Sequence, residues 1–198
     1  MEEQRAIHLL KQGDLQGLDF LVKRYYYRAV KSAYLILQDH AEAENIVQNA
    51  FLHAYENINQ LASARFGPWF LRSVVNASLK AAQRQKKHTS LDAEVEGQSL
   101  ADLLADQKPM PESEVEMDEL VQAVRGALAR LPAEQRAALV MKYYLELSEA
   151  EMVTKLDRPL STVKWRLYTA RQRLKNILQP YFSKADDLQS TDTSQHQE

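Results

Sequence analysis

The chain of 198 residues contains no cysteine. This absence excludes disulfide bonds, thiolate metal ligands and a cysteine nucleophile, and it suits a reducing compartment. The sequence also lacks an N-terminal apolar stretch like a signal peptide, and no apolar run approaches the about 20 residues that a membrane span needs. We therefore expect a cytoplasmic protein without membrane insertion.

Glycine and proline are scarce, with 5 and 6 residues, and strands of alternating apolar and polar residues are hardly seen. Apolar residues instead recur at steps of three and four, which predicts helices with one buried face. The clearest such series consists of Leu18, Leu21, Val22, Tyr25, Ala29, Ala33 and Leu37. We predict an all-α fold of one large or two small domains.

Residues typical of catalysis are sparse. The five histidines are dispersed, and the pairs His40–Glu44 and His53–Glu56 have the spacing of ordinary contacts on a helix surface. No glycine-rich phosphate loop and no cluster of metal ligands is present. We expect no enzyme activity, no metal, no cofactor and no small-molecule substrate.

Charge is strongly segregated although the formal net charge is only −2. Basic residues are concentrated in residues 80–88 and 155–175, whereas residues 92–119 are strongly acidic. A segregated field of this kind steers charged partners. The two basic blocks favour a nucleic acid as one partner.

Residues 147–171, LSEAEMVTKLDRPLSTVKWRLYTAR, predict a helix-turn-helix. Ser148 and Glu151 have the spacing of a capping box, and Asp157 suits a left-handed turn at the break. The second helix should begin at residues 159–161 and continue to Leu178, where Pro180 stops it. Its first turns would enter a major groove. The simpler interpretation is a helical hairpin with a solvated basic face.

Two further stretches have both a functional and a structural interpretation. In FGPWFLRSVVNASLKAAQRQKK, residues 66–87, aromatic residues precede a basic tail, as in proteins that hold unstacked bases; the structural interpretation is that Trp69 and Phe70 are core residues. In AEAENIVQNAF, residues 41–51, Glu42, Asn45, Gln48 and Asn49 share a polar face. The spacing of these residues, taken alone, favours the interpretation that this face is ordinary solvated helix surface.

The ordered set of these motifs resembles the extracytoplasmic-function (ECF) sigma factors of bacterial RNA polymerase. KQGDLQGLDFLVKRYYYRAVKSAYLILQDHAEAENIVQNAFLHAYENI resembles the start of their domain two, and FGPWFLRSVVN resembles the family's F-x-x-W-L-x-x-x-A-x-N segment. LPAEQRAALVMKYYLELSEAEMVTKLDRPLSTVKWRLYTARQRL resembles their domain four. The likeness covers about residues 4–178.

The resemblance implies a subunit that binds the clamp and flap regions of the polymerase core and directs initiation at promoters. By this resemblance, the residues that dock on the core are Asn45, Gln48 and Asn49. The residues expected to contact the melted −10 element are Asn57, Asn59, Arg65, Phe66, Trp69, Asn76, Lys80 and Arg84. The residues expected to contact the −35 duplex are Ser161, Thr162, Lys164, Trp165, Arg166, Tyr168, Thr169 and Arg171. An anti-sigma factor is also implied as a partner.

This chain departs from the family at several of these positions. Members usually carry acids where Asn45 and Asn49 stand, so two charge-assisted bonds to the core would be missing. Lys80 replaces a frequent aspartate, and Trp165 replaces a small residue. An indole there offers apolar contact to a thymine methyl group, which predicts an unusual −35 sequence.

The resemblance divides the chain into four segments. We expect sigma domain two in residues 1–88, a flexible acidic linker in 89–114, sigma domain four in 115–182 and a disordered tail in 183–198. Two other interpretations remain: a dimeric helix-turn-helix regulator, and a degenerate sigma-like adaptor that does not initiate transcription.

Overall fold

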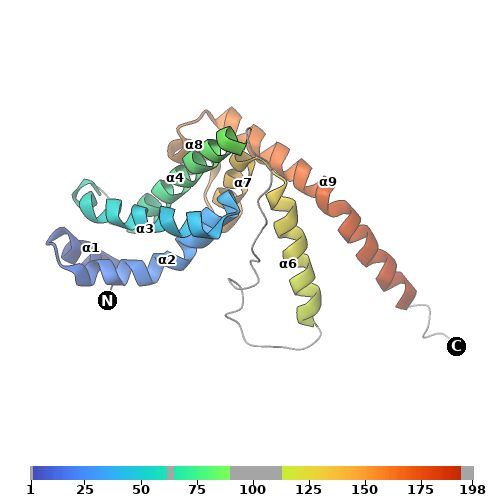
Figure 1. The fold of residues 1–198 in the computed structure, drawn as a ribbon, viewed down its shortest axis with the longest axis horizontal. Helices are drawn as coiled ribbons and strands as arrows, with labels where there is room; N and C mark the ends of the chain where they lie inside the picture. Colours follow the sequence, from blue (N-terminus) through green and yellow to red (C-terminus); the bar gives the residue numbers. More distant parts are fainter. Residues whose placement is uncertain (1, 62–64, 90–112, 193–198) are drawn as a thin grey trace.

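The computed structural model describes residues 2–61, 65–89 and 113–192 of the chain. Every regular element within these ranges is helical (Figure 1), which confirms the predicted all-α fold. None of the described helices combines the length and the apolarity that crossing a bilayer requires. The predicted acidic linker lies almost entirely outside the described residues.

The N-terminal half is a bundle of four helices and a short 3₁₀ turn. The elements are α1 (Glu3–Lys11), α2 (Leu15–Leu37), α3 (His40–Glu56), η1 (Ile58–Gln60) and α4 (Phe66–Thr89). Aspartates start the two middle helices, because Asp14 accepts from the Gln16 amide at 2.8 Å and Asp39 accepts from the Glu42 amide at 3.0 Å. Such caps satisfy amide groups that a helix start leaves without a partner.

Helices α1 and α2 approach each other most closely at Gly17. A Cβ atom there would lie 2.3 Å from the Ala6 carbonyl oxygen, so only glycine fits. The apolar series predicted for α2 is buried at Leu21, Tyr25, Ala29, Ala33 and Leu37. The periodicity therefore identified the inward face correctly.

Aromatic rings fill the centre of this bundle. Phe66 and Phe70 of α4 are fully buried and stack with their ring centroids 5.1 Å apart. Phe51 of α3 lies 4.2 Å from Phe70, and Tyr25 of α2 lies 5.6 Å from Phe66. This cluster fixes the start of α4 against α2 and α3.

The described residues of the C-terminal half, 113–192, form four helices and one π-helical turn. The elements are α6 (Ser113–Ala129), α7 (Ala133–Leu139), η2 (Val140–Tyr144), α8 (Glu149–Leu156) and α9 (Leu160–Asp192). The Leu145 amide donates to the Val140 carbonyl at 2.9 Å, which is the wider bond of a π turn. The sequence predicted one helix to about Leu145 and gave no sign of this turn.

Two predicted helix boundaries differ from the structure. Helix α4 begins at Phe66 rather than at the predicted Pro68. The first turn of a helix accepts a proline, because the amide groups of that turn have no helical partner and the missing N–H is not needed. Helix α9 does not end at Pro180 but continues to Asp192, which contradicts the predicted stop. Pro180 only deprives the Asn176 carbonyl of its helical partner. Of the predicted tail, residues 183–192 are thus helical, and residues 193–198 lie outside the described part.

The two halves are packed against each other. Helix α7 contacts α2 and α4, and α6 packs along α9. Figure 1 shows α7 beside the N-terminal helices, while the far end of α9 extends away from the body. One buried apolar cluster includes residues of both halves, from Ala6 to Leu167.

Candidate polymerase and nucleic-acid interface

The helix-turn-helix is formed by α8 and α9. The Ser148 hydroxyl accepts from the Glu151 amide at 3.2 Å, and the Glu151 carboxylate accepts from the Ser148 amide at 2.9 Å. The Ser148 hydroxyl also donates to the Glu151 carboxylate at 2.7 Å. This bond is the largest cause of a Glu151 pKa below its ordinary value, and the bond from the Ser148 amide lowers the pKa further. Asp157 ends α8 in the left-handed region at φ 50°. Both sequence predictions for this turn are confirmed.

The first turns of α9 have one buried face and one exposed face. Val163, Leu167 and Ala170 are buried and hold the helix against α7 and α8. On the opposite face Trp165 and Tyr168 expose 62% and 60% of their surfaces. Ser161 and Lys164 are exposed beside them. Tyrosine and tryptophan are enriched at contact surfaces, because one end of the side chain is apolar and the other is polar.

The other residues predicted to read the −35 element are placed differently. Thr162, Arg166 and Thr169 are half-buried, and Arg171 is exposed but donates through Nε to its own helix at Leu167. The Thr169 hydroxyl donates to the Trp165 carbonyl at 2.8 Å and accepts from Gln135 Nε2 at 3.1 Å. Thr169 thus fixes α9 to α7 in this structure.

Gln135 links α7 to α9, a contact that the sequence did not indicate. Its side chain is buried, donates to Thr169 and accepts from Arg173 Nη1 at 3.3 Å. It therefore helps to fix α9 against α7. A lone glutamine in the first turn of a short helix gives no signal of this role.

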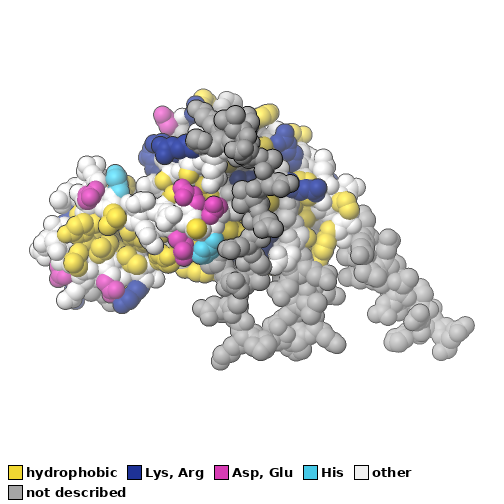
Figure 2. All heavy atoms as spheres, viewed as in Figure 1, with side chains coloured by type: hydrophobic (Ala, Val, Ile, Leu, Met, Phe, Trp, Pro, Cys, Tyr) yellow, Lys and Arg dark blue, Asp and Glu magenta, His cyan; other side chains and the backbone are white. Residues whose placement is uncertain are grey.

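The predicted docking residues lie on the outer face of α3. Asn45, Gln48 and Asn49 are exposed, whereas Ile46, Val47 and Ala50 on the inner side are buried. The same outer face continues through Leu52 and Tyr55, which are 60% and 40% exposed. Figure 2 shows hydrophobic side chains gathered over the N-terminal helices. Leu52 follows Gln48 by four residues, so helical spacing would have revealed this extension.

Four residues predicted to contact the −10 element form one line along α4. Trp69 is half-buried, Asn76 is half-buried, and Lys80 and Arg84 are exposed. Their spacing of seven, four and four residues keeps them on one face of a helix. The line runs from an aromatic start to a basic end, as a track for a single strand would.

The remaining −10 candidates lie in the chain between the end of α3 and the start of α4. Asn57 caps α3 by donating to the His53 carbonyl at 2.9 Å, while Asn59 and Arg65 are exposed. Phe66 is fully buried and stacked on Phe70. In this structure Phe66 supports Trp69 from below, at 5.7 Å between ring centroids, and offers no surface to a base.

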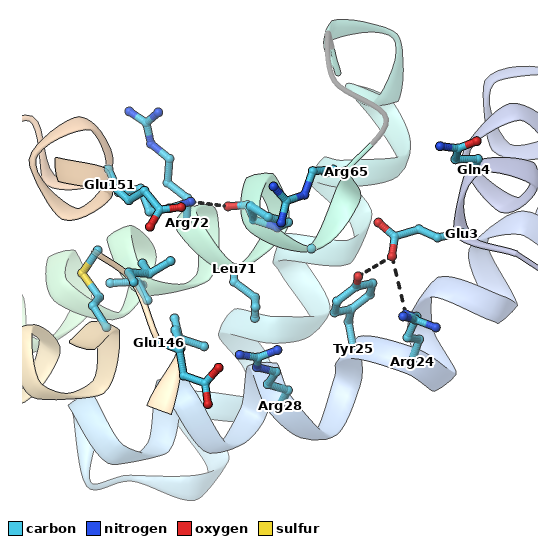
Figure 3. A pocket seen from close by; sticks show the side chains of 17 residues that line it. Glu3, Gln4, Arg24, Tyr25, Arg28, Arg65, Leu71, Arg72, Glu146 and Glu151 are labelled. Atoms are coloured by element: carbon cyan, nitrogen blue, oxygen red, sulfur yellow. Dashed lines mark hydrogen bonds and ion pairs between the residues drawn. The ribbon is translucent and has the colours of Figure 1, made fainter. Parts of the chain in front are cut away.

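An open cavity of about 580 Å³ lies where the start of α4 meets α8. Its basic lining residues are Arg24, Arg28, Arg65, Arg72 and Lys155. In Figure 3 Arg24 and Tyr25 both turn toward Glu3, which accepts from the Tyr25 hydroxyl at 2.6 Å. Burial raises the pKa of Tyr25, and the bond to Glu3 raises it further. Glu3 also accepts from the Phe66 amide at 2.9 Å, so α1 holds the start of α4.

Two family models match the two halves of this chain. The model of sigma-70 region 2 matches residues 21–88, and the model of sigma-70 region 4 matches residues 121–174. The first match covers the outer face of α3 and the line along α4, and the second covers the helix-turn-helix. These matches define the class of the protein as a sigma factor of the sigma-70 type.

Curated relatives are similar over nearly their whole length. The ECF RNA polymerase sigma factor SigW of Bacillus subtilis is 31% identical, with 88% of this chain and 95% of SigW covered. The RNA polymerase sigma-H factor of Pseudomonas aeruginosa is 26% identical, with 93% and 97% covered. This chain belongs to the ECF family of RNA polymerase sigma factors. It directs promoter-specific transcription, and the alternatives of a dimeric regulator and an adaptor are not favoured.

Solved structures of sigma factors share the fold. CnrH in complex with the cytosolic domain of CnrY aligns with a TM-score of 0.57 and 16% identity over 90% of this chain and 97% of that chain. The sigma factor RpoE in complex with the anti-sigma factor NepR from Bartonella quintana aligns with a TM-score of 0.62 and 18% identity, over 81% and 97%.

Proposed function

We propose that this sigma factor docks on core RNA polymerase through the outer face of α3, captures the melted −10 element along α4 and reads the −35 duplex with the first turns of α9. The observation that carries the proposal is the exposed face of α9. Lys164, Trp165 and Tyr168 are turned to solvent there while the opposite face is packed. This is the arrangement that a major-groove helix requires.

Each exposed group on α9 suits a different part of the duplex. The Lys164 ammonium can contact a phosphate or a guanine edge, and the Tyr168 hydroxyl can hydrogen-bond. The Trp165 indole offers an apolar surface that fits a thymine methyl group. Ser161 and the half-buried Thr162 and Arg166 lie at the margins of this face, where contacts to phosphates are expected.

In the proposed −10 site on α4, Trp69 would stack on a base, and the basic residues Lys80 and Arg84 follow it along the helix. Trp69 is the aromatic ring with surface left for a base, because Phe66 is buried beneath it. Asn59 and Arg65 precede this ring in the chain, and Asn76 follows it about two turns along α4. Lys80 and Arg84 would continue toward the phosphates of the strand. Asn57 contributes by capping α3 at the edge of the site.

An apolar groove of the C-terminal half would bind the flap region of the polymerase. The groove has a volume of about 790 Å³, and its walls include Val124 and Leu128 of α6 and Leu174 of α9. Arg171 and Lys175 stand at its rim. An apolar segment of the core would bury its side chains there. Arg171 would then serve the polymerase contact as well as the DNA phosphates.

The proposed activity places the protein in the cytoplasm, where polymerase and promoters are found, and it requires no catalysis by the sigma factor itself. An anti-sigma partner is also proposed, since the similar sigma factor RpoE from Bartonella quintana forms a complex with the anti-sigma factor NepR. A partner that covered the groove between α6 and α9 would block the flap contact.

Transcription in vitro tests this proposal. The purified chain is added to sigma-free core polymerase with fragmented genomic DNA of the host, and transcript starts are mapped. The proposal predicts discrete starts that share a −35 and a −10 element. Binding to the core without any discrete start would instead indicate an adaptor.

A further inference from the structure

The cavity of about 580 Å³ shown in Figure 3 is bounded by both halves of the chain. The halves are joined by hydrogen bonds such as that from Arg136 Nε of α7 to the Ile36 carbonyl of α2, at 2.7 Å. One wall of the cavity comes from α1, α2 and the start of α4, and the other comes from η2, α8 and the turn between them. Its volume lies within the range of about 300–1,000 Å³ that pockets for small molecules have. Of the lining residues, the function proposed above uses only Arg65.

Three cationic side chains converge at the end of the cavity where α8 meets α4. Lys155 Nζ donates to the Pro68 carbonyl at 2.9 Å, and Arg65 and Arg72 also line the cavity. Burial lowers the pKa of Lys155, and the positive charges of Arg72 and Arg65 lower it further, against an opposing effect of Glu151. The three cations are therefore close enough to repel one another. An anion between them would replace this repulsion by attraction.

The acidic residues of the lining leave this end of the cavity with an excess of positive charge. Glu151 is the carboxylate there, and it accepts hydrogen bonds from the Ser148 amide and hydroxyl at 2.9 and 2.7 Å. Glu3 accepts from the Tyr25 hydroxyl and lies 3.5 Å from Arg24 Nε. Among the described lining residues at this end, three cations thus face one carboxylate that Ser148 already engages. Such an excess suits a ligand with several negative charges, and a chain of phosphate groups meets this requirement.

The middle of the cavity is lined by apolar side chains from both halves. These buried residues are Leu71 and Val75 of α4, Met141 of η2 and Leu145. In Figure 3 Leu71 lies between Arg72 on one side and Arg28 on the other. Apolar surface beside a few polar groups is typical of pockets for small organic molecules, and it suits the flat face of a nucleobase.

Polar groups line the cavity beyond Leu71. Arg28 and Glu146 are both exposed, and the Arg28 guanidinium donates to the Tyr144 carbonyl at 3.4 Å. Figure 3 shows these two side chains near each other, away from Arg72. A guanidinium offers only donors and a carboxylate offers only acceptors, so together they can pair with the polar edge of a base.

We propose that this cavity binds a nucleoside triphosphate. The triphosphate lies against Arg65, Arg72 and Lys155, and the base packs in the apolar middle. Arg28 and Glu146 contact the polar edge of the base, where a carboxylate fits the two adjacent N–H groups of guanine. A cavity of this volume holds one small molecule and no strand of several nucleotides, which favours a free nucleotide over a nucleic acid. Nucleotide binding would require neither polymerase nor promoter DNA, so it succeeds or fails independently of the proposed function.

Calorimetric titration of the full chain with guanosine triphosphate (GTP) tests the proposal. We expect one bound GTP per chain and about tenfold weaker binding to Arg72→Gln, because a charge-assisted contact to phosphate is lost. Lys155→Gln, on the opposite wall, should show a similar loss. Arg130→Gln removes the same charge at an exposed position outside the cavity and should bind GTP like the wild type. Full affinity of both cavity variants would overturn the proposal.

The two parts of the nucleotide, guanosine and inorganic triphosphate, separate the classes of ligand. GTP should bind at least about tenfold more tightly than either part, since the cavity contacts the base and the phosphates together. Equal affinities for GTP and triphosphate would indicate a general polyanion site and overturn the assignment to a nucleotide. A lack of detectable GTP binding at about 1 mM would also overturn it.

Adhesion of GTP to the basic surface of α9 is the competing explanation. Lys164→Gln removes a charge from that surface and lies outside the cavity, so this variant should bind GTP as the wild type does. A loss of affinity in Lys164→Gln together with full affinity in Arg72→Gln would assign the binding to α9 and overturn the proposal. Arg72 is exposed, so Arg72→Gln should keep the fold, and thermal unfolding without nucleotide checks this.

Discussion

Trp165 is the residue whose chemistry departs most from that of a polar base reader. Its indole is 62% exposed on the outer face of α9 and makes no contribution to the core. We predict that Trp165→Ser alters the preferred −35 sequence while the free energy of unfolding changes by less than about 0.5 kcal/mol. Start mapping on a library with a randomised −35 element measures the first effect, and thermal unfolding measures the second. An unchanged −35 preference would exclude Trp165 from base readout.

Asn45 and Asn49 set the strength of core docking in the proposed mechanism. Both amides are exposed on α3 beside Gln48, at positions where carboxylates would form charge-assisted bonds. We predict that Asn45→Asp, Asn49→Glu tightens binding to the core about tenfold or more. Gln12→Glu, Gln16→Glu adds the same charge near the turn between α1 and α2 and should have little effect. Equal affinities of the two variants for the core would argue against docking through this face of α3.

The first turn of helix α8 is stabilised by the carboxylate of Glu151. Glu151 has a pKa below its ordinary value of 4.5 because the ionised form accepts two hydrogen bonds from Ser148. A depressed pKa contributes stability above the ordinary value, and this contribution is lost as the pH falls through the lowered value. We predict that the wild type is more stable than Glu151→Gln at neutral pH and that the difference disappears well below pH 4.5. Thermal unfolding of both proteins across this range checks the sign, and a difference independent of pH would contradict it.

The packing of α1 on α2 depends on a single glycine. Gly17→Ala would place a methyl group 2.3 Å from the Ala6 carbonyl oxygen, and we expect a loss of about 1–3 kcal/mol in the free energy of unfolding. Gly126→Ala in α6 is the matched control, because no atom lies within 4 Å of its added methyl group. That change should stabilise the protein by about 0.5–1 kcal/mol. Chemical denaturation measures both values, and similar effects of the two changes would show that Gly17 is no packing constraint.

Local features of the elements were predictable from the sequence because their causes are local. The capping box at Ser148 and the left-handed turn at Asp157 involve residues only a few positions apart. The π turn was not predictable, since tertiary packing decides it. The stop at Pro180 was predicted wrongly, because the loss of one helical bond did not end α9.

For the molecule as a whole, the contact between the halves was invisible in the sequence. Arg136 and Ile36 are separated by 100 residues, and no spacing pattern links them. The same limit applies to Gln135, whose role depends on Thr169 in a distant helix. The candidate surfaces were predicted as separate motifs, whereas their relative positions required the structure. The assignments to −10 and −35 DNA stay predictions.

A footprinting comparison on one promoter tests whether the proposed DNA-binding surfaces of α4 and α9 engage DNA together only when the chain is bound to core polymerase. A DNA fragment with both mapped elements is footprinted with the chain alone, with core polymerase alone and with both. We predict specific protection of both elements only when chain and core are combined. Tight, sequence-specific protection by the isolated chain would contradict this mechanism, because the two surfaces would then need no polymerase to set their spacing.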